Sequence, residues 1–145
     1  MNLKVRLGAQ ELTAFLDQVF PQMHSGGRVF FIEDVGPGEA KVRLEAGENE
    51  LRPGGTVSGP SLMTLADFAA YTVILSNIGP QALAVTTNLN INFLRKAEKG
   101  AVFAAARILK LGKRLVVIDC EIWQGARENL VGHATATYSI PPQSQ

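Results

Sequence analysis

The sequence predicts an α+β domain in which a curved antiparallel sheet wraps around one long buried helix. Residues 61–77 carry apolar side chains at helical spacing on one face and are largely apolar on the opposite face as well. That pattern is typical of a buried helix. Two strand-like segments precede this helix and four follow it. Long strands joined by short turns can pair in antiparallel order and cover such a helix.

Length and composition favour one compact domain over residues 1–145. The chain is 46% hydrophobic and 19% charged, which provides enough apolar material for a sizeable core. Its net charge is +1. A charge this small argues against binding to nucleic acid or to a membrane surface through a strong electric field.

Cysteine usage and the first residues indicate a cytoplasmic protein. Cys120 is the only cysteine, so neither an internal disulfide nor a cysteine-based zinc cluster can form. The N-terminal residues are amphipathic and lack the apolar core of a signal peptide. The central apolar run is short for a membrane span and is interrupted by polar residues. We therefore expect a soluble cytoplasmic protein.

The chain begins with a predicted helix over residues 9–23 and continues with a predicted hairpin. The helix carries an apolar stripe, and Pro21 is expected to end it early. Residues 28–35 are rich in β-branched and aromatic side chains, and residues 39–46 alternate between apolar and polar. The Gly-Pro-Gly turn between them predicts that these two strands pair.

The central helix, expected over residues 61–77, has a recognisable start and one charged side chain. Pro60 suits the first helical position, and Ser58 or Gly59 would be the cap. Asp67 is the only charged side chain of the helix. A carboxylate among apolar residues is costly unless it is hydrogen-bonded or paired. Asp67 is therefore either a structural residue that bonds a nearby amide or hydroxyl, or a functional residue whose charge or basicity is used.

Four more strands are predicted over residues 84–94, 101–111, 115–124 and 130–140. The three asparagines of the first strand are too many for a buried sheet surface and are expected to face water or a partner subunit. Strict alternation divides the first strand into two faces: Val85, Thr87, Leu89, Ile91 and Phe93 on one, and Thr86, Asn88, Asn90 and Asn92 on the other.

Three motifs stand out between residues 36 and 141. They are S-G-P-S-L-M-T-L-A-D-F-A-A-Y at 58–71, V-T-T-N-L-N-I-N-F-L-R-K at 85–96 and T-A-T-Y-S-I-P at 135–141. Together and in this order, they resemble the hotdog-fold acyl-CoA thioesterases of the phenylacetate-degradation type. The resemblance implies a long helix held in a curved sheet, acyl-CoA as the substrate, and a homodimer with two interfacial sites, often doubled to a tetramer.

The resemblance assigns catalysis to Asp67 and Gly59. Thioester hydrolysis needs a nucleophilic water, which Asp67 could activate, unless it attacks the carbonyl itself. The N–H of Gly59 lies at the helix N-terminus and could donate to the oxyanion. Ser58 stands where the family has a His, and it either takes over part of that role or is only a helix cap. Thr64 either binds the water or bonds its own helix backbone.

The candidate substrate contacts fall into two groups. Basic side chains at a turn suit the phosphates of CoA, although a solvated turn would carry the same charges. Apolar and aromatic side chains on the central helix suit the acyl group. The basic side chains at the turn are Arg95 and Lys96. Asn92, shortly before that turn, and Arg52, which stands where the family has an Asn, are added to this first group. The second group is Met63 and Tyr71.

The missing family His and Asn leave a second function open, a non-catalytic module that binds acyl-CoA or an acyl-carrier protein. A hydratase or dehydratase ranks below both, because that chemistry usually needs a His paired with the acid. His24 and His133 have no partners at metal-ligand spacing. Trp123 and Tyr138 are interpreted as packing residues. We predict a thioesterase that uses no metal and no cofactor beyond the CoA of its substrate.

Overall fold

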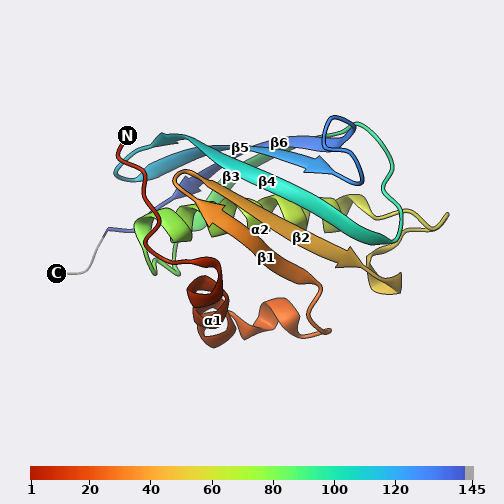
Figure 1. Cartoon of the computed structure of the whole chain (residues 1–145), viewed down its shortest axis with the longest axis horizontal. Helices are drawn as coiled ribbons and strands as arrows, with labels where there is room; N and C mark the ends of the chain where they lie inside the picture. Colours follow the sequence, from red (N-terminus) through yellow and green to blue (C-terminus); the bar gives the residue numbers. More distant parts are fainter. Residues whose placement is uncertain (143–145) are drawn as a thin grey trace.

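A computed structural model describes residues 1–142 of the chain. Six antiparallel strands form one sheet in the order β1-β2-β4-β5-β6-β3, and this sheet curves around helix α2 (Figure 1). The predicted hotdog architecture, one long helix held in a curved antiparallel sheet, is confirmed. The strands are β1 (Phe30–Gly36), β2 (Glu39–Ala46), β3 (Val85–Phe93), β4 (Gly100–Leu111), β5 (Leu115–Trp123) and β6 (Leu130–Ser139).

Helix α2 (Gly59–Ile78) forms the centre of the hydrophobic core, two residues longer at its start than the sequence predicts. Every side chain from Phe68 to Asn77 is buried. By length and composition alone α2 could cross a membrane, but its burial identifies it as the core helix of the fold. Its first turns differ, because Met63 and Thr64 are exposed. The sheet therefore covers the second half of α2 fully and leaves one face of the first half open.

Helix α1 (Ala9–Val19) packs beside β1 and α2 through the buried side chains Leu12 and Leu16 (Figure 1). The helix ends before Pro21, as the sequence predicts, and a 3-10 turn, η1 (Pro21–His24), follows. A second 3-10 turn, η2 (Glu48–Glu50), precedes α2. Because the backbone leaves the helical conformation at Phe20, the chain turns sharply between α1 and η1.

The strict alternation expected for β3 is wrong at its start. The register between β3 and β6 shifts between Thr86 and Asn88, which marks a β-bulge. Because a bulge adds one residue, Thr86 lies on the helix-facing side of the sheet and Val85 is 56% exposed. Beyond the bulge, the apolar residues of β3 still face the helix and its asparagines face outward, opposite the outward residues of β6.

Candidate active site

The carboxylate of Asp67 is held by two hydroxyl groups on one of its oxygens. Tyr138 Oη donates to Asp67 Oδ1 at 2.6 Å, and Thr86 Oγ1 donates to the same atom at 2.6 Å. Within residues 1–142, no protein donor contacts Oδ2. Two short bonds to one oxygen orient the carboxylate and leave its second oxygen available to a ligand or a water.

The two hydroxyl donors come from neighbouring strands. Tyr138 lies near the end of β6 and pairs across the sheet with Thr86 near the start of β3. Burial, followed by the negative charge of Asp67, raises the pKa of the Tyr138 phenol above its ordinary value. Tyr138 therefore remains a neutral donor at physiological pH, and the β3 bulge is what turns Thr86 toward the same carboxylate.

Asp67 opens into a cavity of about 470 Å³ that has mostly apolar walls. Phe68, Tyr71 and Tyr138 form one wall, and Tyr71 Oη donates to the carbonyl of Ala82 at 2.7 Å. The volume falls within the range of pockets for small organic ligands. The remaining lining residues are Val19, Phe20, Gln22, Met23, Thr64, Leu83, Ala84, Val85 and Thr86.

The first turn of α2 presents one free backbone donor. Ser58 Oγ accepts from Ser61 N at 3.2 Å, and the Ser58 carbonyl accepts from Leu62 N at 3.1 Å. Pro60 has no N–H. Within residues 1–142, no acceptor contacts the N–H of Gly59. This N–H lies at the positive end of the helix dipole, where a developing oxyanion is stabilised.

A second hollow, of about 400 Å³, lies beside this helix start and is lined by several basic side chains. Arg52, Arg95 and Lys96 line it together with Gly59 and Phe93. Arg52 is distant from the other two in the sequence, so tertiary structure joins it to their turn. Lys99 of the same turn instead pairs with Glu48 at 2.8 Å on the surface. Three cations close to a helix N-terminus form an arrangement suited to phosphate groups.

The other predicted site residues lie around these two hollows. Ser58 is the helix cap, and its hydroxyl also donates to Ser61 Oγ at 2.9 Å. Thr64 lines the Asp67 cavity, but its hydroxyl donates to the Pro60 carbonyl at 3.0 Å. Met63 is 39% exposed on the open face of α2. Asn92 is exposed on β3, opposite His133. Their catalytic or binding roles stay predictions.

The two hollows cannot serve one thioester within a single chain. Gly59 and Asp67 are eight residues apart on the same helix, which corresponds to about 12 Å along its axis. A thioester carbonyl and its attacking group must lie roughly 3 Å apart. The oxyanion donor and the carboxylate can therefore meet at one substrate only if each comes from a different copy of the chain.

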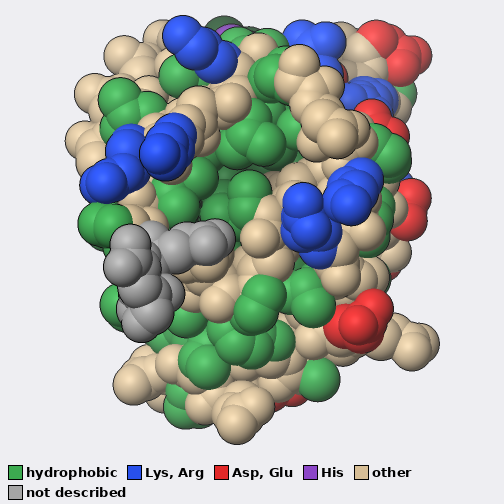
Figure 2. Space-filling view, turned by 90° about the vertical axis from the view of Figure 1, so that its left-hand side faces the viewer, with side chains coloured by type: hydrophobic (Ala, Val, Ile, Leu, Met, Phe, Trp, Pro, Cys, Tyr) green, Lys and Arg blue, Asp and Glu red, His purple; other side chains and the backbone are tan. Residues whose placement is uncertain are grey.

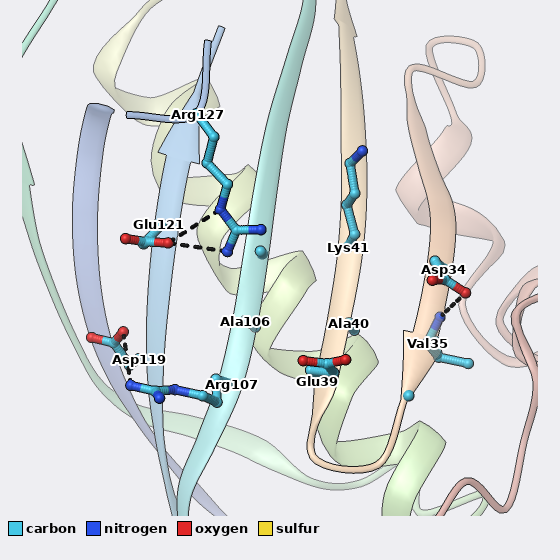
Figure 3. Close-up of a pocket in the computed structure, with 12 residues that line it drawn as sticks. Asp34, Val35, Glu39, Ala40, Lys41, Ala106, Arg107, Asp119, Glu121 and Arg127 are labelled. Atoms are coloured by element: carbon cyan, nitrogen blue, oxygen red, sulfur yellow. Dashed lines mark hydrogen bonds and ion pairs between the residues drawn. The ribbon is translucent and has the colours of Figure 1, made fainter. Parts of the chain in front are cut away.

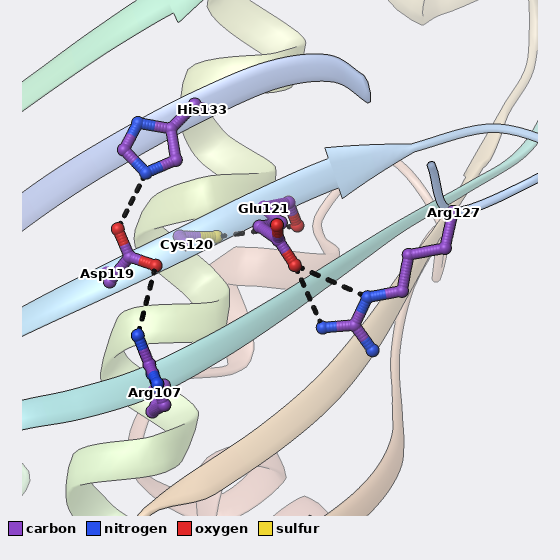
Figure 4. Close-up of polar contacts among 6 residues, drawn as sticks. All are labelled: Arg107, Asp119, Cys120, Glu121, Arg127 and His133. Atoms are coloured by element: carbon purple, nitrogen blue, oxygen red, sulfur yellow. Dashed lines mark hydrogen bonds and ion pairs between the residues drawn. The ribbon is translucent and has the colours of Figure 1, made fainter. Parts of the chain in front are cut away.

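A third hollow, of about 460 Å³, lies on the outer face of the sheet, away from Asp67 (Figure 3). Four of its charged side chains form ion pairs within the chain. Arg127 donates to Glu121 at 3.0 Å, and Asp119 contacts both His133 at 2.6 Å and Arg107 at 4.0 Å (Figure 4). We interpret these pairs as a solvent-facing ion-pair network. Within residues 1–142, no cluster of His, Cys, Asp or Glu could hold a metal ion.

Sequence reasoning missed the two residues that hold Asp67. Tyr138 was expected to be a packing residue, and it is buried, but its hydroxyl also bonds the carboxylate. Thr86 was placed on the face turned away from the helix, because the bulge is invisible in an alternating pattern. Tyr138 lies 71 positions after Asp67 in the chain, and pairing of β6 with β3 brings it beside Thr86, so no local spacing rule could have joined these residues.

Comparison with known proteins identifies the family. The profile of the thioesterase superfamily matches residues 54–131, more than half of the chain. The chain belongs to this superfamily. It is also 31% identical over 114 residues to a Pseudomonas aeruginosa protein that carries the name of an esterase, covering 77% of this chain and 83% of the relative. Its similarity to the 1,4-dihydroxy-2-naphthoyl-CoA hydrolase of Listeria monocytogenes is 31% identity over 91 residues, 63% of this chain and 74% of that enzyme.

Solved structures of this superfamily share the whole fold. A protein of Silicibacter sp. TM1040, provisionally assigned as a thioesterase, is 43% identical, with a TM-score of 0.87 and coverage of 98% of this chain and 97% of that one. The phenylacetic acid degradation protein PaaI of Thermus thermophilus is 27% identical, with a TM-score of 0.70 and coverage of 83% and 99%. The predicted relation to the phenylacetate-degradation type is therefore confirmed.

Proposed function

We propose that this thioesterase-superfamily protein hydrolyses acyl-CoA thioesters to a free acid and CoA. The observation that carries the proposal is the carboxylate of Asp67. Two hydroxyls anchor one of its oxygens, and Asp67 lines a mostly apolar cavity. The name of the Listeria relative, a CoA hydrolase, supports CoA as the leaving group.

Asp67 activates a water molecule or attacks the thioester carbonyl itself. In the first route, Oδ2 takes the proton as water adds to the carbonyl carbon, and the C–S bond then breaks to release CoA. In the second, Oδ2 attacks the carbonyl carbon, the C–S bond breaks to release CoA, and water then hydrolyses the acyl-aspartate anhydride to the free acid and the Asp67 carboxylate. Tyr138 and Thr86 position the carboxylate in both routes. The N–H of Gly59 donates to the oxygen that becomes negative when the carbonyl is attacked.

The active unit is a homodimer that joins the Gly59 side of one copy to the Asp67 side of the other. β3 is an edge strand, so its outer backbone groups are open to pairing. Antiparallel pairing of two β3 strands about Leu89 would set Phe93 of one copy opposite Val85 of the other. Phe93 adjoins Gly59, and Val85 lines the Asp67 cavity. Further pairing of dimers would give the tetramer that the resemblance implies.

The basic hollow beside Gly59 holds the phosphates of CoA. Arg52, Arg95 and Lys96 line this hollow, and arginine forks match phosphate geometry. Arg52 replaces an Asn of the family and adds a positive charge at this position. Asn92 precedes Phe93 at the end of β3, and we infer that it contacts the substrate across the subunit boundary. A single reduced, buried Cys120 fits a cytoplasmic location.

Thiol release from a panel of acyl-CoAs tests the function. Wild-type protein is expected to release CoA, and Asp67→Asn is expected to lower kcat by about 10²–10⁴-fold because it removes the general base or nucleophile. Asp119→Asn is the matched control, since Asp119 lies on the outer sheet face. Near-native turnover by Asp67→Asn would overturn the assigned role. Saturable binding without release by the wild type would favour the non-catalytic binding module instead.

A further inference from the structure

One side of the Asp67 cavity is formed by residues from the N-terminal part of the chain. Val19 and Phe20 at the end of α1, with Gln22 and Met23 of η1, line one side of it. These residues lie outside the segment 54–131 that matches the superfamily profile. We call Val19, Phe20 and Met23 the α1–η1 wall. The break at Phe20 and Pro21 is what turns these side chains toward the cavity.

The opposite side of the cavity mouth is also apolar and open. Leu83 is 79% exposed and Val85 is 56% exposed, while Val19 and Phe20 are 42% and 41% exposed. All four are among the large hydrophobic side chains that are exposed in the described part of the chain. Figure 2 shows hydrophobic side chains gathered in hollows on the end of the molecule where β6 finishes. Exposed apolar side chains around one cavity favour an apolar occupant.

The charges that line the cavity further restrict the chemical class of its ligand. No lysine or arginine lines the Asp67 cavity within the described residues. Asp67 itself repels a second carboxylate, and an unpaired anion in an apolar pocket is costly. Within the same copy, the three basic side chains of the second hollow lie beside Gly59, about 12 Å along the α2 axis from Asp67. The lining that one copy supplies therefore favours an uncharged acyl group over a dicarboxylic one.

We propose that the α1–η1 wall determines acyl specificity. It selects uncharged apolar acyl groups, and it favours longer ones because they bury more apolar surface against Phe20 and Met23. This inference rests on the proposed function, since it assigns the Asp67 cavity to the acyl part of the substrate. It adds specificity-determining residues outside the profile-matched region. Each methylene buried against this wall is worth about fourfold in affinity.

Ratios of kcat/KM between substrates test the wall, because a ratio cancels any general loss of active protein. Wild type is expected to prefer pentanoyl-CoA over succinyl-CoA by at least about a hundredfold. Phe20→Ala is expected to lower the decanoyl-to-butyryl ratio by about tenfold or more, because the longer chain loses apolar surface to contact. Leu109→Ala, an exposed apolar residue of β4 outside the cavity, is the matched control. Its ratios are expected to equal those of the wild type.

A gain of function makes the test sharper. Val19→Lys places a cation at the cavity mouth and is expected to raise the succinyl-to-pentanoyl ratio about tenfold, whereas Leu109→Lys should not change it. If the wild type is active and both Phe20→Ala and Val19→Lys leave the substrate ratios of kcat/KM unchanged, the wall does not determine specificity. The proposed function would then still stand.

Binding of non-hydrolysable thioether analogues of the acyl-CoAs separates the two proposals. If the wild type releases no thiol, calorimetry can still measure affinity against acyl length. Affinity that rises with length in the wild type and less steeply in Phe20→Ala would support the wall in the absence of catalysis. Affinity that does not depend on acyl length would overturn it.

Discussion

At the scale of single residues, the proposed chemistry depends on one carboxylate and its two donors. Asp67 is half-buried, and a half-buried carboxylate is stabilised when hydroxyl groups replace the water it loses. Because Tyr138 and Thr86 both bond Oδ1, Oδ2 keeps its lone pairs for the reaction. The structural and functional interpretations of Asp67 are compatible, because the hydrogen bonds that stabilise the carboxylate also orient it for the proposed reaction.

Removing either donor should lower catalysis without removing the carboxylate. Tyr138→Phe and Thr86→Val are each expected to reduce kcat/KM by about 10- to 100-fold, the worth of a hydrogen bond to a charged group. Steady-state thiol release measures this. Tyr71→Phe is the reference, because that hydroxyl bonds a carbonyl rather than Asp67. An equal or larger fall in Tyr71→Phe would contradict a special role for the two donors.

At the scale of elements, α2 carries the two halves of the site at different points along its length. Its cap, its missing Pro60 N–H and its free Gly59 N–H make the first turn a donor site. Eight residues later the same helix presents Asp67 on the face that the sheet leaves open. The start of β3 is the other decisive element, since its bulge turns Thr86 inward. Periodicity predicted the helix well but could not predict the bulge.

Gly59→Pro should delete the oxyanion donor while keeping the helix. Proline is accepted at the first helical position, and Ser58 already has the extended backbone that precedes proline, with ψ 152°. We expect kcat to fall by about 10²–10³-fold, with the circular dichroism spectrum unchanged. Gly59→Ala keeps the N–H, and its Cβ would meet only the end of the Phe93 ring at 3.4 Å. Equal losses in the two variants would argue against the donor role.

At the scale of the whole molecule, the proposed site is complete only between two copies of the chain. The axial separation of Gly59 and Asp67 exceeds the reach of one thioester, and the edge position of β3 provides a way to join two copies. Several charged side chains on the outer face of the sheet, by contrast, form ion pairs within one chain.

Mixing two inactive variants should therefore restore activity. Refolding Asp67→Asn together with Gly59→Pro gives mixed dimers in which one site has both intact groups. Random pairing makes half of the dimers mixed with one good site in two, so about a quarter of wild-type activity is expected. Each variant refolded alone should stay inactive. A mixture no more active than its components would contradict an interfacial site.

Alkaline pH should destabilise the fold through buried weak acids. Burial, then the charges of Asp119 and Glu121, raises the pKa of the Cys120 thiol from 9.0 to about 12. Above about pH 9 the unfolded chain loses this proton and the folded chain keeps it, so the free energy of unfolding falls as pH rises toward 12. Burial raises the pKa of Tyr138 with the same sign.

Thermal unfolding between pH 8 and pH 10.5 measures this effect. The loss attributable to one such group is about 1.4 kcal/mol per pH unit above its unfolded pKa. Cys120→Ala is expected to be less stable than the wild type at neutral pH, because it leaves a small cavity, yet to lose less stability on going above pH 9. Parallel curves for the two proteins would show that the thiol does not titrate as argued.

The sequence by itself determined the architecture, because a helix apolar on every side requires a sheet around it, and alternating strands with short turns can supply that sheet. Its motifs also identified Asp67 and Gly59 as candidates, since both lie within one continuous segment. Tertiary structure alone decided what surrounds them. The hydroxyls of Tyr138 and Thr86, the approach of Arg52 to Arg95, and the apolar wall from α1 all depend on strand pairing and packing between distant segments. Local periodicity carries no information about such contacts, because it reports which face a side chain occupies and not which partner it meets there.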